Sequence, residues 1–243
     1  LSIVVLKKKN ELFFMFVLTF ILSEALIFLS GDRSAFFYIN LSAIFVILFS
    51  QKLLKLRLLT LLSSMFLLVV ISYINPAAWD RIFNQTLDQM NLVDGMKNKN
   101  EKIFIFSEQH TKHYVTAYKI FLDNKFLGVG VKNFRNFCSN DKYDETGTSC
   151  STHPHNTYVQ ILSETGIIGF LFLLILLYYF CKKVFIHFIL KFKNKFYFRD
   201  FEICVLSGIA IYLWPFVPTG NVFSNWLNIA LILNFPFLIW SIK

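Results

Sequence analysis

Charged residues are scarce in this sequence: they make up 16% of its 243 residues, whereas hydrophobic residues make up 56%. So little charge beside so much apolar surface is unusual for a soluble domain and favours a membrane protein. A small-residue cleavage site is also missing after the basic start 7–9, and further apolar runs follow. We therefore interpret the first apolar run as a membrane span rather than a signal peptide.

The surplus of positive charge has a regular position along the chain. Lysine and arginine outnumber acidic residues by 24 to 15, which gives a formal net charge of +9. One basic cluster, 7–9, precedes the first apolar run, and the others follow every second run, at 52–57, 182–199 and Lys243. Clusters on one side of the membrane orient a membrane protein with that side in the cytoplasm. This pattern indicates membrane orientation and argues against nucleic-acid binding.

Apolar runs of about 20 residues can cross a membrane as helices, and helices satisfy their own backbone hydrogen bonds there. About six such runs occur, at 11–31, 35–51, 57–75, 157–181, 201–218 and 223–241. The sequence therefore predicts an all-α polytopic membrane protein. Transmembrane helices lie in 1–75 and in 157–243, and between them one large, partly helical extracytoplasmic loop, 76–156, carries the site residues.

Within that loop, residues 103–126 have the spacing of a helix, and Gly128 and Gly130 end it. Helical spacings of three and four recur there among Tyr114, Ala117, Tyr118, Phe121 and Leu122. Cys138 and Cys150 follow in the same loop. A disulfide between them is predicted because the compartment outside the cytoplasm is oxidising, although two free thiols are the alternative.

Two histidines, His153 and His155, flank a proline just before the fourth apolar run. Imidazole titrates near pH 6.5 and can act as base, acid or anion ligand. Asn156 is suited to cap the helix that begins at Thr157. The positive end of that helix dipole is expected to keep the His155 imidazole neutral, as a general base must be. His155 is the first catalytic candidate, and His153 is either a binding residue or a solvated loop histidine.

Cations that could hold a phosphate lie in three places. Arg33 follows the first span, and a planar guanidinium binds two phosphate oxygens at once; alternatively, Asp32 and Arg33 only form a polar turn. Arg81 and Arg135 are surface charges unless the loop folds back over Arg33. Lys132 and Arg135 follow two glycines and could cradle an anion.

His110 and His113 are three residues apart on the predicted loop helix, so they share a face. The spacing permits a metal, but no third ligand stands at a suitable distance. We therefore predict no metal site, and interpret both as facing substrate or solvent.

Three of these elements resemble one family. His155-Asn156, nine residues and then Gly166-Ile-Ile-Gly169 resemble the H-[N/S/Q]-x9-G-x-x-[G/T/Y] signature of bacterial O-antigen ligases. Ser30-Gly-Asp-Arg-Ser-Ala35 resembles the family's [S/T]-G-S-R-[S/T]-A element at the end of an earlier span. Phe126-Leu-Gly-Val-Gly130 is similar to the G-x-G element that precedes the family's histidine.

The resemblance implies an inverting, metal-independent glycosyl transfer without cofactor at the periplasmic face of the bacterial inner membrane. The implied donor is a glycan on undecaprenyl pyrophosphate, and the acceptor is a sugar hydroxyl of lipid A–core. It assigns His155 to activating that hydroxyl or assisting at the pyrophosphate, which Arg33 and a loop arginine would hold. Members usually have about twice as many spans, and the chain begins with Leu1 rather than Met. We therefore expect this chain to be the C-terminal part.

One departure and two alternatives stay open. Many members carry an arginine where this chain reads Ser107-Glu-Gln-His-Thr-Lys-His113, so the second pyrophosphate ligand is His110, Lys112 or His113, or else Arg81 or Arg135. An O-antigen polymerase has the same chemistry with another lipid-linked glycan as acceptor. A transporter or flippase subunit needs charged residues at membrane depth, and inside the predicted spans only Glu24 and Glu164 meet that requirement.

Overall fold

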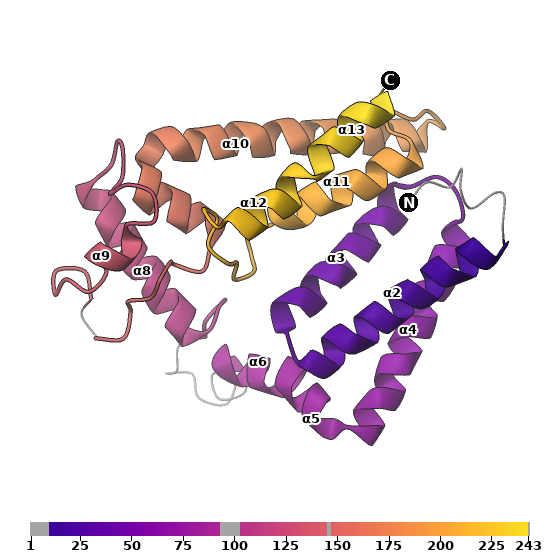
Figure 1. Ribbon diagram of the computed structural model, residues 1–243, viewed down its shortest axis with the longest axis horizontal. Helices are drawn as coiled ribbons and strands as arrows, with labels where there is room; N and C mark the ends of the chain where they lie inside the picture. The colour runs from indigo at the N-terminus through magenta and orange to yellow at the C-terminus, as the bar shows by residue number, and fades with distance from the viewer. Residues whose placement is uncertain (1–9, 93–102, 145–146, 243) are drawn as a thin grey trace. The chain divides into compact units, whose positions relative to one another are not determined.

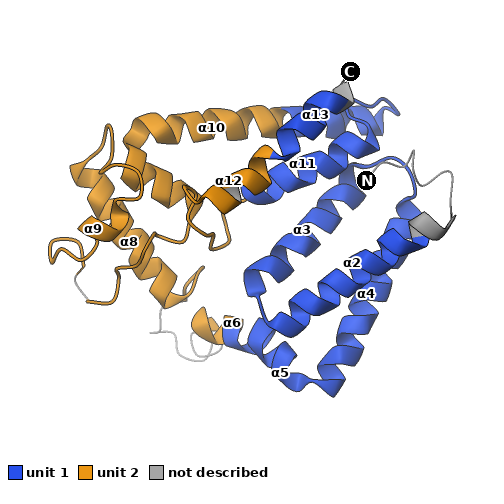
Figure 2. Ribbon diagram, viewed as in Figure 1, with its two compact units in different colours: residues 1–85, 183–213, 233–243 blue, residues 86–182, 214–232 orange. Residues whose placement is uncertain are grey.

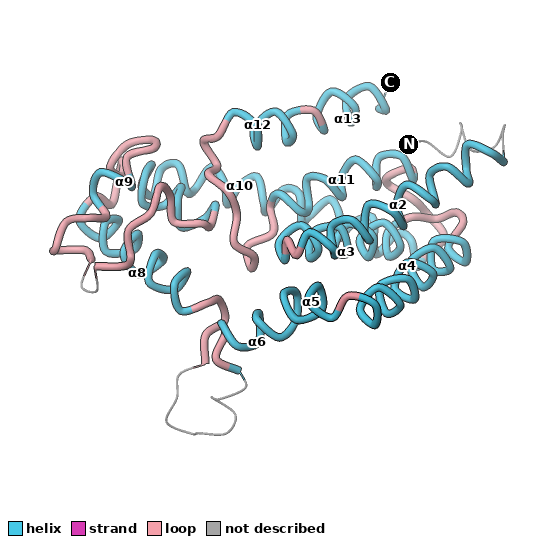
Figure 3. Tube along the Cα trace, turned by 60° about the horizontal axis from the view of Figure 1, so that its bottom comes forward, coloured by secondary structure: helices cyan, strands magenta, loops and turns pink. Residues whose placement is uncertain are grey.

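The computed structural model describes residues 10–92, 103–144 and 147–242, so the basic start 7–9 lies outside the described residues. Every regular element in these ranges is helical (Figure 1), and the Cα trace contains no strand there (Figure 3). The predicted all-helical fold class is therefore confirmed. The chain forms two compact units, and each combines segments that are distant in sequence (Figure 2).

Unit 1 comprises residues 1–85, 183–213 and 233–243 (Figure 2). Its helices are α2 (Asn10–Ser30), α3 (Arg33–Phe49), α4 (Leu54–Ile74), α5 (Pro76–Trp79), the π-helix η1 (Asp80–Asn84), α11 (Asp200–Tyr212) and α13 (Asn234–Ile242). The most extensive helix–helix contacts are those of α3 with α11 and of α2 with α4. Phe28, Leu68, Ala78 and Ile82 form a buried cluster where α2 and α4 meet the segment after Pro76.

Unit 2 comprises residues 86–182 and 214–232 (Figure 2). It contains most of α6 (Gln85–Gln89), then α8 (Glu108–Asp123), α9 (Phe134–Phe137) and α12 (Asn225–Ile232). The long helix α10 (Thr157–Phe192) begins in unit 2 and ends in unit 1. The core of unit 2 is small and consists of Ala117, Ile120, Phe134, Cys138 and Tyr143.

Two helices, α4 and α10, are long and apolar enough to cross a membrane. A core helix of a soluble protein would also be long and apolar, but it would be mostly buried. Here only 11% of the apolar window of α4 and 22% of that of α10 are buried, which points to membrane association. The shorter apolar stretches Phe14–Ser30, Arg33–Phe49 and Asn228–Trp240 fall below that length. The number of spans therefore stays a prediction.

Three helices do not have the bounds of the expected spans, which stay predictions. Helix α10 extends to Phe192 instead of 181, while α11 ends at Tyr212 because Pro215 and Pro218 cannot continue it. The expected span 223–241 is two helices, α12 and α13, separated at Leu233. Pro236 explains the break, because it has no N–H to donate to the carbonyl four residues earlier.

The buried face of α8 is partly polar. Tyr118 and Leu122 are 52% and 43% exposed, whereas the helix buries His113, Thr116, Ala117 and Ile120. Two of these buried side chains are polar, so a hydrophobic pattern cannot reveal them. Buried polar groups need hydrogen-bond partners, and Ser149 supplies them: its carbonyl oxygen lies 2.7 Å from His113 Nδ1, and its hydroxyl accepts from Thr116 at 2.8 Å.

Candidate functional site

The histidine loop, residues 151–156, is held by its backbone. His155 adopts a left-handed conformation with φ of 59°, which is uncommon for a residue with a Cβ. Its carbonyl oxygen accepts from Thr219 N–H at 2.8 Å and from the Tyr114 hydroxyl at 3.4 Å. The sharp turn and the two anchors fix the direction in which the His155 side chain leaves the loop.

Asn156 caps α10. Its Oδ1 accepts from the N–H groups of Tyr158 and Val159 at 3.0 and 3.2 Å, so the orphan donors at the start of the helix are satisfied. Its Nδ2 donates to the Pro215 carbonyl at 2.9 Å. Asn156 therefore contributes to the site by positioning its neighbour His155, because one side chain joins the histidine loop, α10 and the segment after α11.

Both ring nitrogens of His153 are engaged. Nε2 lies 3.3 Å from the Thr219 carbonyl oxygen, which can only accept, so Nε2 carries the hydrogen. The other nitrogen, Nδ1, is then an acceptor for the Thr152 hydroxyl at 3.0 Å. Burial lowers the pKa of His153, and the nearby His113 and Arg135 add to that effect. These contacts hold His153 as a neutral ring in one tautomer.

Three other imidazoles surround His155. The ring centroids of His153, His110 and His113 lie 4.1, 5.3 and 5.6 Å from its own. His110 and His113 come from one face of α8, as their spacing predicts, with ring centroids 6.2 Å apart. Ser107, the N-cap of α8, lies 2.7 Å from His110 Nδ1 through its hydroxyl. Four of the five histidines therefore meet at one place.

The His155 imidazole is neutral, and among the described residues its ring nitrogens have no hydrogen-bond partner. Burial lowers its pKa to about 4, with smaller electrostatic contributions from His153, His110 and His113. Within the described ranges, neither ring nitrogen makes a hydrogen bond, although the ring is only partly buried. A neutral imidazole with a free lone pair is suited to accept a proton.

The glycine-rich segment after α8 docks onto a break in α10. Gly166 is non-helical, with φ of 65° and ψ of −165°, and a Cβ there would overlap the Phe126 carbonyl. The Ile167 N–H released by the break donates to the Lys125 carbonyl at 2.8 Å. In return, Gly130 N–H donates to the Glu164 carbonyl at 2.9 Å. The segment that contains Gly128 and Gly130 and the α10 break at Gly166 are thus in close backbone contact.

The Glu164 side chain also joins α10 to the glycine-rich segment after α8. Its buried carboxylate accepts from the backbone N–H groups of Lys132 and Phe134, both at 3.0 Å, and from Gln160 Nε2 at 3.1 Å. Gln160 also donates to Asn221 Oδ1 at 2.8 Å. Lys132 therefore contributes its backbone to the scaffold, while its side chain is exposed.

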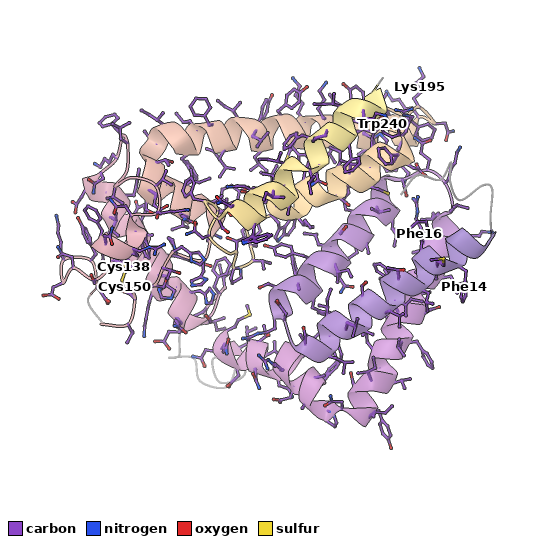
Figure 4. All side chains as sticks on the ribbon, in the orientation of Figure 1. Phe14, Phe16, Cys138, Cys150, Lys195 and Trp240 are labelled. Atoms are coloured by element: carbon purple, nitrogen blue, oxygen red, sulfur yellow. A yellow bond between two sulfur atoms is a disulfide. The ribbon has the colours of Figure 1, made fainter. Side chains whose placement is uncertain are left out.

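A disulfide joins Cys138 and Cys150, with their Cα atoms 5.0 Å apart (Figure 4). It links the end of α9 to the segment that leads into the histidine loop. Arg135 lies on α9, is exposed, and is close enough to His153 to act on it electrostatically. Arg135 is thus the predicted cation that the structure brings near the histidines of unit 2.

Arg33 and Arg81 come together in unit 1. Asp32 caps α3 by accepting from Ala35 N–H at 3.0 Å, and Arg33 is the first residue of that helix. Gly31, with φ of 68°, precedes the cap, and a Cβ there would overlap the side chain of Arg81. The chain after α4 therefore folds back so that Arg81 crosses the turn that carries Arg33.

Sequence reasoning missed Gln160 and Thr219. Thr219 anchors both histidines through its backbone, and Gln160 joins Glu164 to the same 214–222 segment. Lys112 pairs with Glu108 at 2.9 Å. In the described part of the chain, no group of three or more His, Cys, Asp or Glu residues is arranged to hold a metal ion.

Comparison with known proteins gives one match. A family model described as O-antigen ligase matches residues 16–174, about two thirds of the chain. The matched stretch contains both units' candidate residues, from Arg33 to the glycines that follow His155. The comparison with curated proteins found no match, and neither did the comparison with solved structures.

Proposed function

Because this chain belongs to the O-antigen ligase family, we propose that it transfers a glycan from undecaprenyl pyrophosphate to a sugar hydroxyl of lipid A–core. The family supports glycosyl transfer of the ligase or polymerase kind; the donor and acceptor are our proposal. The observation that carries it is His155, a neutral imidazole whose ring nitrogens make no hydrogen bond within the described ranges. Such a group suits the one proton transfer that the reaction requires.

In the proposed step, His155 accepts the proton of the acceptor hydroxyl as its oxygen attacks the anomeric carbon of the donor. The bond from that carbon to the pyrophosphate oxygen breaks on the opposite face, so the configuration inverts. Undecaprenyl pyrophosphate leaves with the bonding electron pair, and the proton remains on the imidazole until solvent removes it. His153 keeps a fixed tautomer beside His155, while His110 and His113 help to keep that ring neutral.

Cations would stabilise the leaving pyrophosphate. Arg33 and Arg81 share the α2–α3 turn, and two guanidinium groups there suit a pyrophosphate, which carries several acceptor oxygens. Arg135 and the exposed Lys132 side chain are candidates for the glycan or a second phosphate. His110 and His113 lie in the segment where many relatives carry an arginine, so they are further candidates for the second pyrophosphate ligand.

The proposed setting is the bacterial inner membrane, with about six spans and the histidines at its periplasmic face. Two long apolar helices support membrane association, and the segments 52–57 and 182–199 are basic, as cytoplasmic loops are. The disulfide between Cys138 and Cys150 agrees with an oxidising compartment for the loop.

A polymerase of the same superfamily is the second candidate, since it differs only in using a lipid-linked glycan as acceptor. A transporter or flippase subunit has less support. Its expected charged pathway would include Glu164, but that carboxylate is occupied by backbone N–H groups. Glu24, which also lies away from the ends of its predicted span, accepts from the Ser64 hydroxyl.

The test is a lipopolysaccharide gel on cells that lack the full-length gene, complemented with wild type or His155→Ala. If all O-antigen disappears from lipid A and lipid-linked polymer accumulates, the protein is a ligase. A single repeat unit left on the core identifies a polymerase. An unchanged ladder with His155→Ala, at equal protein level in the membrane, contradicts the role of His155.

A further inference from the structure

Unit 1 contains a cavity of about 380 Å³ that the glycosyl transfer does not use. It lies among α2, α3, α4 and α11, and its walls are mostly apolar, with Phe16, Phe20, Val46 and Leu61 among the lining residues. Figure 4 labels Phe16 on α2. A volume of this size is in the range of small-ligand pockets. Apolar walls indicate an apolar occupant.

The polar residues of the lining include an ion pair. Arg57 and Asp200, from the first turns of α4 and α11, are joined at 3.3 Å between Nη2 and Oδ2. Their side chains are 18% and 7% exposed. The other terminal nitrogen of Arg57, Nη1, is buried without a hydrogen-bond partner among the described residues. A buried donor without a partner costs free energy, so an acceptor at this point would stabilise the protein.

Asp200 cannot supply that acceptor, because its carboxylate is already used. Oδ1 accepts from Gln51 N–H at 2.8 Å, and Oδ2 accepts from Lys52 N–H at 3.0 Å as well as from Arg57. Lys191 interacts electrostatically with both members of the pair, and its Nζ donates to the carbonyls of Leu48 and Ser50. Two cations therefore share one carboxylate, which leaves net positive charge beside an apolar cavity.

We propose that this cavity binds the hydrocarbon chain of a membrane lipid whose phosphate headgroup accepts a hydrogen bond from Arg57 Nη1. The apolar walls match the chain, and the orphan donor with its uncompensated charge matches a phosphate headgroup that has net negative charge and no cation of its own. This assignment does not depend on the proposed glycosyl transfer, because no residue of the histidine loop or of the Gly31 turn lines the cavity.

The test uses the purified full-length protein, stripped of lipid in detergent and examined by native mass spectrometry. Phosphatidylglycerol and phosphatidylcholine with identical chains are added separately, and undecaprenyl phosphate is added in a third sample. We expect wild type to retain the anionic phospholipid about tenfold more than the zwitterionic one. Arg57→Gln is expected to lose that preference, whereas Lys55→Gln, an equal charge change at an exposed position on the same helix, keeps it.

A second variant guards against a folding defect, because Arg57→Gln also breaks the ion pair. Ala43→Phe fills the cavity while Arg57 and Asp200 stay intact, and retention of both phospholipids should fall. Equal retention of the two phospholipids by wild type, or unchanged retention by Ala43→Phe, overturns the proposal. If undecaprenyl phosphate is retained more strongly than phosphatidylglycerol and the Arg57→Gln variant loses it, the lipid is a polyprenyl phosphate.

Discussion

The protein uses imidazole in two opposite ways, one in each unit. His187, in the unit 1 part of α10, is fully buried, donates from Nε2 to the Phe49 carbonyl at 2.9 Å, and accepts from Phe198 N–H at 3.0 Å. His155, in unit 2, is partly exposed, and its ring makes no hydrogen bond within the described ranges. Only its backbone carbonyl is held, by Thr219 and Tyr114.

The difference separates structure from chemistry. An imidazole with both nitrogens bonded is a link between segments, and its loss leaves two buried groups without partners. An imidazole fixed by its backbone alone has a defined position and a free lone pair, which a general base requires. The same residue type should therefore give opposite phenotypes at the two places.

The largest effects should come from replacing each of these two histidines by alanine. His155→Ala should lower the rate of transfer at least about 100-fold, because general base catalysis typically contributes that much, and leave the protein level in the membrane unchanged. His187→Ala should instead destabilise unit 1 by about 3 kcal/mol and reduce the amount of folded protein. Transfer rate per folded molecule and thermal unfolding in detergent measure the two. If His187→Ala lowers the rate per folded molecule as much as His155→Ala does, the comparison fails.

The next effect concerns the carboxylate behind the histidine loop. Glu164→Ala should cost about 2–4 kcal/mol of unfolding free energy, because the N–H groups of Lys132 and Phe134 lose their acceptor inside the protein. Glu108→Ala is the control: that side chain is 60% exposed and only pairs with Lys112, so the cost should stay below about 1 kcal/mol. Thermal unfolding measures both. Equal shifts would mean that Glu164 does not hold the loop.

The break in α10 gives a matched pair of glycines. Gly166 and Gly147 have φ of 65° and 68°, but a Cβ at Gly166 would meet the backbone of Phe126, while nothing lies within 4 Å at Gly147. Gly147→Ala should therefore cost only the backbone strain, about 1 kcal/mol, and Gly166→Ala about twice that or more. The difference in unfolding free energy measures the close contact alone. If both variants lose the same unfolding free energy, the segment after α8 can shift to make room for the added methyl group.

Local sequence patterns predicted some parts of this molecule better than others. The helix start at Thr157 followed from Asn156, and the shared face of His110 and His113 followed from their spacing, because both depend on neighbours in sequence. The buried face of α8 did not follow, since His113 and Thr116 are stabilised there by Ser149, more than 30 residues away. Thr219 holds His153 and His155 through its backbone, which any residue but proline could supply, so its identity gives no sign of that role.

The smallest expected effect tests why the His155 ring is neutral. Burial is the main cause of its pKa of about 4, and His153, His110 and His113 add to it; His153 is in turn influenced by Glu164 and Arg135. The transfer rate should then stay constant from pH 8 to pH 5 and fall only as the pH approaches 4.

The folded pKa lies below the ordinary value of 6.5, so the unfolded chain binds the proton first, and stability should fall as the pH drops from 6.5 towards 4. His113→Gln removes one of the smaller causes of the low His155 pKa. The acidic limb of kcat/KM should therefore move upward by a fraction of a pH unit. Less stability should then be lost between pH 6.5 and pH 4. Lys119→Gln is the control, because Lys119 is partly buried on the same helix, and its acidic limb of kcat/KM should lie at the same pH as that of wild type. An acidic limb already centred near pH 6.5 in wild type would mean that His155 is as open to water as a surface histidine, and its contrast with His187 would then rest on hydrogen bonding alone.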